Sequence, residues 1–169
     1  RRAVDQLGQG SGAPVNVFLD RARLEHIDWR NGRPVWITLA PLRYRSAALG
    51  RILVVPAEFV SDLASVPRMI LAWWIAGGRG VRSSILHDFA YQFGHWGDAE
   101  SGDRIVVDKP AVDAEFFTSL VADAISGASP LIARLMYFGV RWGGRGRWAD
   151  TARAKGLNPE WTAAGWQAR

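Results

Sequence analysis

The amino-acid sequence predicts an α+β fold: N-terminal antiparallel strands and hairpins, then a layer of about four helices and a basic C-terminal arm. Short runs of β-branched and aromatic residues fill roughly the first sixty positions. After Pro67 the apolar residues instead recur with the spacing of helices. The chain has 169 residues, 49% of them hydrophobic, which is enough for one domain with a real core and too few for two comfortable domains.

The predicted strands are bounded by turn signals. Asn31-Gly32 is the strongest of these, because Asn-Gly favours the tight turn of a hairpin, and residues 48–50 form a second turn. The runs between these signals are VNVFLD, RLEHIDW, RPVWITLAPLRYRS and RILVVPAEFV.

The predicted helices begin at recognisable start signals. Ser83 can cap one helix, Pro110 stands near the first turn of the next after Asp108, and Ser129 with Pro130 opens the last. The expected helical ranges are 68–75, 83–93, 110–126 and 130–142.

The termini differ in composition from the segment between them. We expect a single α+β domain over 15–142, between an N-terminal arm at 1–14 and an arginine-, glycine- and tryptophan-rich arm at 143–169. The C-terminal arm should become ordered only on assembly with a partner.

Composition excludes several classes of protein. There is no cysteine, so disulfides and thiolate metal sites are excluded. The longest apolar run, MILAWWIAGG, is far shorter than the roughly 20 residues of a membrane span, so no transmembrane segment is expected. The chain starts without methionine or an apolar leader region, which predicts a fragment or processed chain with no visible signal peptide.

Net charge is +5, and the basic surplus lies near the C-terminus. From Arg134 onward, arginines far outnumber the acidic residues Asp150 and Glu160. Nucleic acid is not expected as a partner, because no nucleic-acid-binding motif accompanies these residues. Surplus tryptophan with arginine is instead typical of protein interfaces, which favours a protein partner or a homo-oligomer.

The stretch SILHDFAYQFG, residues 84–94, places two ionisable groups in an apolar helix. His87 and Tyr91 are four residues apart and therefore stack, and Asp88 is adjacent. The helix is apolar almost all round, so at least one of the ionisable groups should face the interior. A buried charge is costly unless it is paired, hydrogen-bonded or bound to a metal.

Asp113 is the expected partner. It lies four residues before Phe117 on the apolar stripe of the next long helix, so it should point inward toward His87. A carboxylate in that place can hold the imidazole tautomer while the imidazole activates a water. In the alternative interpretation, Asp113 caps a helix and His87 bonds a backbone carbonyl.

A polar turn precedes Pro67. Asp62 and Ser65 lie there, where a strand end could present a carboxylate and a hydroxyl to a cleft. Local hydrogen bonds of a well-formed turn explain the same residues.

Five segments between residues 41 and 144 occur in a characteristic order: PLRYRS, VPAEFVSDLASVPR, LHDFAY, VDAEFF and LMYFGVRWGG. In these segments the sequence resembles a bacteriophage and prophage family known as domain of unknown function 1353. Val112 stands where that family usually has alanine before the aspartate, and the carboxylate is kept. The resemblance covers roughly residues 40–145 and implies a phage origin, with the protein in the virion or in the host cytoplasm.

The H-D-x-x-Y helix is also similar to the active-site helix of secreted and parvoviral phospholipases A2. That likeness implies His87 as general base, Asp113 as the group that orients it, and Tyr91 as a supporting hydrogen-bond donor. It also implies Ca²⁺ at Asp88, with Asp62 as a further oxygen ligand.

Two functional hypotheses follow. One is a tail-associated or accessory phage protein that acts as a cation-assisted hydrolase on a host envelope component. The other is a non-enzymatic phage structural or assembly protein, in which these groups form a satisfied polar network between helices and sheet. Convergence of the groups with an opening to solvent would favour the enzyme, and a sealed network would favour the structural role.

Overall fold

The computed structural model of the chain has the expected α+β class, and its described residues form antiparallel sheets followed by three helices. Several predicted features lie outside the described residues: the arm at 1–14, the arm at 143–169 apart from residues 143 and 148, the helix expected at 68–75, and Asp62 with Ser65. The structure describes residues 15–30, 33–61, 63, 80–125, 127–143 and 148.

The strands form two antiparallel sheets. One has five strands in the order β1-β4-β5-β7-β8, and the other has three in the order β2-β3-β6. Arg30 pairs with Arg33, so the β2–β3 connection is the Asn31-Gly32 step that predicted a hairpin. The strands are β1 (Val17–Phe18), β2 (Leu24–Arg30), β3 (Arg33–Thr38), β4 (Leu42–Ser46), β5 (Arg51–Val55), β6 (Val60–Ser61), β7 (His95–Asp98) and β8 (Arg104–Val106).

The run at 33–46 is divided between the two sheets. Its first part is β3, paired with β2 and β6, and its second part is β4, paired with β1 and β5. Along β4, Leu42, Tyr44 and Ser46 are buried and alternate with exposed arginines, which is the pattern of a sheet with one face on the core.

The helices are α2 (Val81–Phe93), α3 (Lys109–Ala122) and α4 (Pro130–Gly143). Asp108 caps α3 as expected, accepting a hydrogen bond from the Ala111 amide at 2.9 Å. The prediction that Ser83 caps α2 is wrong. The cap is Gly80, whose left-handed conformation (φ 81°) lets the helix begin before Ser83, and Ser83 is buried within it.

A β-hairpin between α2 and α3 was not predicted. His95 begins β7, which pairs with β5 on one side and β8 on the other. Gly94 ends α2 in a left-handed conformation (φ 74°), so the chain can turn directly back into the sheet. The fully buried Trp96 fixes this hairpin to α2 by donating its indole N–H to the Leu86 carbonyl at 2.8 Å.

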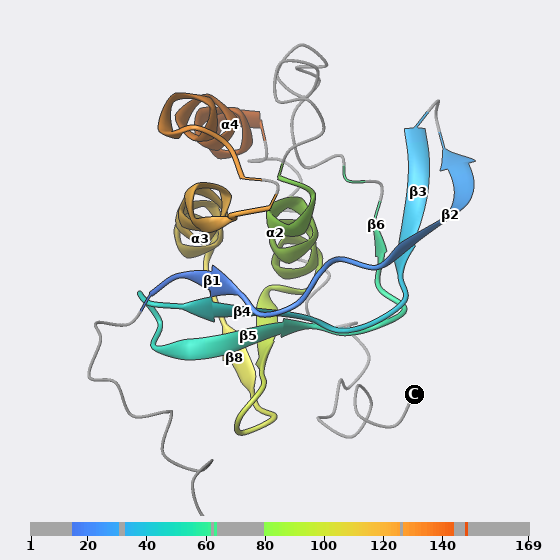
Figure 1. The fold of residues 1–169 in the computed structure, drawn as a ribbon, viewed down its shortest axis with the longest axis horizontal. Coiled ribbons are helices and arrows are strands. Elements are labelled where there is room, and N and C mark those ends of the chain that lie inside the picture. Colours follow the sequence, from blue (N-terminus) through green and yellow to red (C-terminus); the bar gives the residue numbers. More distant parts are fainter. Residues whose placement is uncertain are drawn as a thin grey trace, which may run out of the picture.

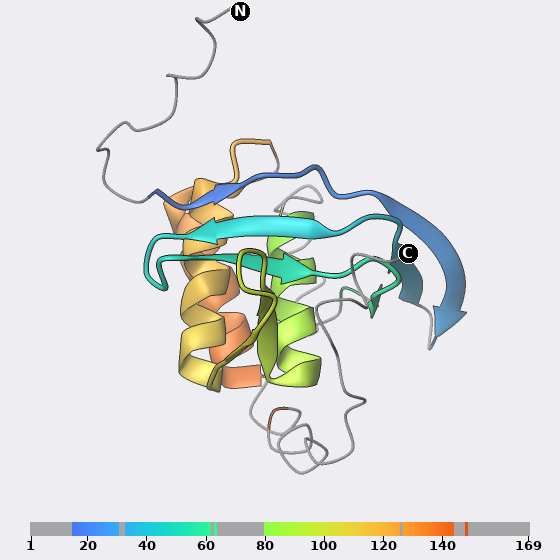
Figure 2. The ribbon, with the colours of Figure 1, turned by 90° about the horizontal axis from the view of Figure 1, so that it is seen from below.

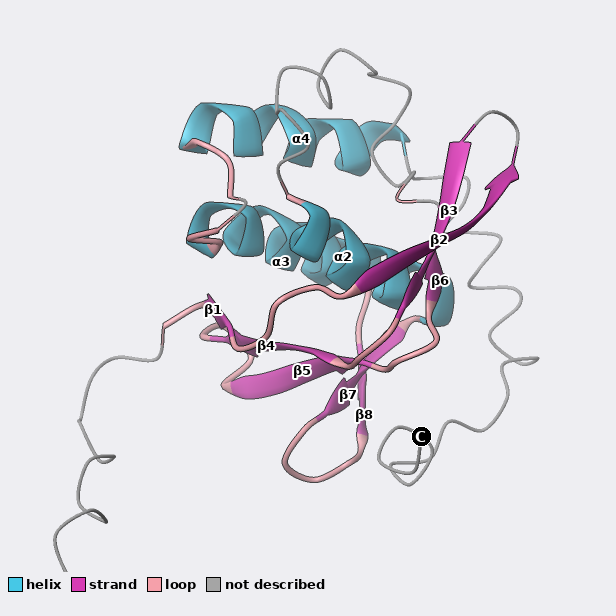
Figure 3. Cartoon of the chain, turned by 45° about the vertical axis from the view of Figure 1, so that its right-hand side comes forward, coloured by secondary structure: helices cyan, strands magenta, loops and turns pink. Residues whose placement is uncertain are grey.

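The elements are arranged in layers. The helices lie on one face of the five-stranded sheet, and α4 lies beyond α3, away from the strands (Figure 1). Seen from the sheet side, β4 and β5 cross in front of the helices (Figure 2). Figure 3 shows β2 and β3 extending to one side of this stack. No helix in the described part of the chain is long and apolar enough to cross a membrane.

Two apolar clusters hold the layers together. The first lies between the sheet and α2 and includes Tyr44, Leu53 and Trp96. The second lies between α3 and α4 and includes Phe116, Leu120 and Met136. The helix α2 contacts both α3 and strands β5, β6 and β7, so it is the central element of the fold.

We predict that Gly80→Ala destabilises the protein more than Gly50→Ala does. Both glycines have positive φ, which costs an alanine about 1–2 kcal/mol. A Cβ at Gly80 would also lie 2.5 Å from the Leu120 Cδ2 atom, whereas a Cβ at Gly50 meets nothing within 4 Å. Urea unfolding should therefore show a loss of about 2–4 kcal/mol for Gly80→Ala and about 1–2 kcal/mol for Gly50→Ala. Equal losses would contradict this account.

Candidate functional site

The central helix α2 is buried on all sides. Every residue from Arg82 to Tyr91 is buried, because the sheet, α3 and the β7–β8 hairpin surround it. His87 and Asp88 therefore both lie in the interior, with exposed fractions of 1% and 7%. On a helix with one face exposed, two adjacent residues would point in different directions, and one of them would face solvent. Here both ionisable groups need partners inside the protein.

His87 meets Asp113, as the sequence predicts. The His87 Nε2 atom lies 3.3 Å from Asp113 Oδ1, and Asp113 is fully buried. The imidazole ring stacks on Tyr91, with centroids 4.9 Å apart and planes at 26°. Phe116 of α3 contacts the ring at a centroid distance of 4.9 Å. The orientation of the imidazole is thus fixed by one carboxylate and two aromatic rings.

Asp113 also binds two cationic side chains that the sequence analysis missed. Lys109 Nζ lies 2.6 Å from Asp113 Oδ2, and Arg141 Nη1 lies 3.5 Å from the same oxygen. The Lys109 ammonium donates further hydrogen bonds to the Val140 and Arg141 carbonyls, at 3.1 and 3.3 Å. The four-residue spacing of Lys109 and Asp113 is a signal that could have identified the first partner. Asp113 and Lys109 together link α2, α3 and the end of α4.

Asp88 is held from the β6 side. The Ser61 hydroxyl donates to Asp88 Oδ2 at 2.5 Å, and the Leu63 amide donates to the Ser61 oxygen at 2.9 Å. The other carboxylate oxygen, Oδ1, lies 3.9 Å from His87 Nδ1. Within the described residues this Nδ1 atom has no hydrogen-bond partner. Asp62, expected nearby, is outside the described residues.

The two carboxylates favour the charged form of the imidazole. Burial lowers the pKa of His87, but the two nearby carboxylates of Asp113 and Asp88 outweigh burial and raise the pKa above its ordinary value. Burial likewise raises the pKa of Asp113, but His87 and Lys109 outweigh it and hold this pKa below its usual range. These side chains form a network of basic groups around carboxylates, buried except for Arg141, which we call the His87 network: His87, Asp88, Lys109, Asp113 and Arg141.

The described residues provide little for a calcium ion. They contain no group of three or more His, Cys, Asp or Glu side chains arranged to hold a metal. Both oxygens of Asp113 face cationic or imidazole partners, which would repel a divalent cation. Calcium at Asp88 and Asp62 stays a prediction, because Asp62 is outside the described residues.

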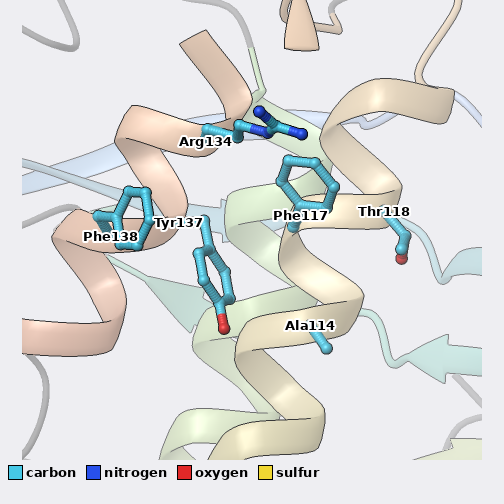
Figure 4. A pocket seen from close by; sticks show the side chains of 6 residues that line it. All are labelled: Ala114, Phe117, Thr118, Arg134, Tyr137 and Phe138. Atoms are coloured by element: carbon cyan, nitrogen blue, oxygen red, sulfur yellow. The ribbon is translucent and has the colours of Figure 1, made fainter. Parts of the chain in front are cut away.

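A surface groove lies apart from the His87 network. It has a volume of about 440 Å³ and runs between α3 and α4 (Figure 4). None of its lining residues belongs to the network. They are Ala114, Phe117, Thr118, Arg134, Tyr137 and Phe138.

Comparison with known proteins identifies one family. Residues 36–140, more than half of the chain, match a family described as "Protein of unknown function (DUF1353)". The matched segment contains every residue of the His87 network except Arg141. No curated protein and no solved structure matches the chain.

We predict that the His87 network makes stability depend on pH in a defined direction. The folded-state pKa of His87 is raised, so its stabilisation is fully present below the unfolded value of about 6.5 and is lost as pH rises through the folded value. Urea unfolding at a series of pH values should show this decline in wild type and not in His87→Gln.

The matched control is His26→Gln, which changes an exposed histidine on β2 and should keep the decline. At pH 6, His87→Gln should be less stable than wild type by about 1–3 kcal/mol, since it removes one of the hydrogen-bonded opposite charges around the buried Asp113 carboxylate. The same pH dependence in wild type and His87→Gln would rule out this linkage.

Proposed function

The chain belongs to the DUF1353 family, and we propose that it is a bacteriophage accessory or assembly protein whose His87 network has a structural rather than a catalytic role. The phage context comes from the family resemblance of its motifs. The protein would act in the virion or in the host cytoplasm. Its function would be to bind other phage proteins.

The observation that carries this proposal is the burial of the network. A general base must come within hydrogen-bond reach of the proton it removes, directly or through one water. His87 is 1% exposed and Asp113 is 0% exposed, with Tyr91 and Phe116 against the imidazole. A substrate could reach the ring only if these side chains moved apart.

The charges support the same proposal. The raised pKa of His87 favours its protonated form, whereas a general base must be neutral to accept a proton. Asp113 is shared among His87, Lys109 and Arg141, so it is not reserved for orienting an imidazole. This arrangement suits a network that fixes the packing of helices.

A cation-assisted hydrolase acting on a host envelope component is the second candidate. The observation that favours it is the His87 Nδ1 atom, which is buried and without a hydrogen-bond partner among the described residues, 3.9 Å from Asp88. A buried polar atom without a hydrogen bond needs an explanation, and a water molecule bound to it would be one. In this candidate His87 is the base, Asp113 orients it, Tyr91 supports it, and Asp88 with Asp62 binds Ca²⁺.

A calcium titration and a turnover assay separate the two candidates. We expect calcium to leave the melting temperatures of wild type and of Asp88→Asn unshifted, and wild type to leave phospholipid and peptidoglycan intact. His87→Ala should lower the melting temperature, with a loss of about 1–3 kcal/mol for the unsatisfied buried partners.

The opposite pattern would favour the hydrolase. It consists of a calcium-dependent rise in the melting temperature that Asp88→Asn removes, together with turnover that His87→Ala abolishes. Asp28→Asn, which removes an exposed carboxylate on β2, is the control for nonspecific calcium binding.

A further inference from the structure

The outer face of α4 carries a row of exposed apolar side chains. Leu131, Leu135, Phe138 and Trp142, which we call the α4 seam, are 70%, 51%, 55% and 69% exposed. The opposite face of the helix is buried against α3 through Ala133, Met136 and Val140. The helix α4 lies beyond α3 and away from the strands (Figure 1), and the seam lies on the side of α4 opposite its buried face.

The spacing of the seam is that of a coiled coil. Its residues are separated by four, three and four positions, so Leu131 and Phe138 take the d positions of a heptad, and Leu135 and Trp142 the a positions. At about 100° per residue they fall within a stripe roughly 60° wide. A stripe this narrow is typical of a seam for another helix, whereas a helix lying on a membrane has a broad apolar face.

The charges beside the seam select the partner. In this heptad Arg134 and Arg141 both take g positions, and α4 contains no aspartate or glutamate. Arg134 is exposed, and Arg141, which also contacts Asp113, keeps a side chain 38% exposed. A second copy packed antiparallel would place arginine against arginine, and a parallel copy would offer Ile132 and Gly139 at the facing e positions. The complementary helix therefore carries acidic residues.

The groove between α3 and α4 borders the same edge. Arg134, Tyr137 and Phe138 line it from α4, and Phe117 lines it from α3 (Figure 4). Phe138 belongs to both the seam and the groove. A helix on the seam would thus have an apolar recess beside it, next to the Arg134 guanidinium.

We propose that the α4 seam binds an amphipathic helix of another protein, apolar at its heptad a and d positions and acidic at the positions that face Arg134 and Arg141. This names a partner class for the assembly role proposed above. The surface is separate from the buried side chains of that proposal, apart from Arg141, so the two can be tested independently.

The test uses two labelled synthetic peptides with Leu at every a and d position. One carries Glu at e and g and the other carries Lys there, so each repels itself and stays monomeric. Fluorescence anisotropy with the full chain should show the Glu peptide binding at least about tenfold tighter than the Lys peptide, a difference that falls at high salt. Arg134→Glu should reverse the preference.

Leu135→Glu should weaken binding of the Glu peptide by about tenfold or more, because it places a charge at the centre of the seam. The matched control is Val106→Glu on β8, where another exposed apolar residue (77%) receives the same charge, and binding should be unchanged. Circular dichroism of each variant establishes that the fold is kept.

Equal affinity for both peptides, or no binding of either, would overturn the proposal. Two other results would also overturn it if neither peptide binds. One is a homodimer in sedimentation that Leu135→Glu abolishes, and the other is binding to phosphatidylglycerol vesicles that Leu135→Glu abolishes. Failure of the peptide assay would refute helix binding at the α4 seam and leave the assembly role untouched. Hydrolytic turnover by wild type would refute the assembly role and leave helix binding at the seam untouched.

Discussion

The fold depends on one fully buried carboxylate that must be neutralised. Asp113 lies on α3, and its partners come from three helices: His87 from α2, Lys109 from α3 and Arg141 from α4. Removing one of these partners would weaken the neutralisation of a carboxylate that is shielded from water, and removing Asp113 itself would leave His87 and Lys109 without their shared counter-charge. These contacts favour one arrangement of the three helices, with the end of α4 held further by the Lys109 bonds to the Val140 and Arg141 carbonyls.

This constraint explains why the most polar part of the core is at its centre. The helix α2 is surrounded by other elements, so the paired groups His87 and Asp88 are both enclosed, one linked to α3 and the other to β6 through Ser61. Apolar contacts alone would allow the helices to slide or rotate, whereas hydrogen-bonded charges specify one register. The exposed apolar side chains Leu131, Leu135 and Phe138 on the outer face of α4 take no part in the hydrogen bonds of the His87 network.

The sequence allowed the fold class, the β2–β3 hairpin and the approach of His87 to Asp113 to be predicted, because each depends on local pattern. The β7–β8 hairpin was missed because its residues, such as Trp96, owe their burial to β5 and α2 rather than to alternation. Lys109 was missed because a lysine is normally exposed. Its burial follows from two distant carbonyls at the end of α4, which no local pattern reveals.

A double-mutant cycle between His87 and Asp113 tests the structural account most directly. The unfolding free energies of wild type, His87→Gln, Asp113→Asn and the double variant would be measured in urea at pH 6, where both groups are charged if the account is right. The account predicts a coupling of about 1–3 kcal/mol, with the double variant far less destabilised than the sum of the single changes. Additive effects, within about 0.5 kcal/mol, would contradict it.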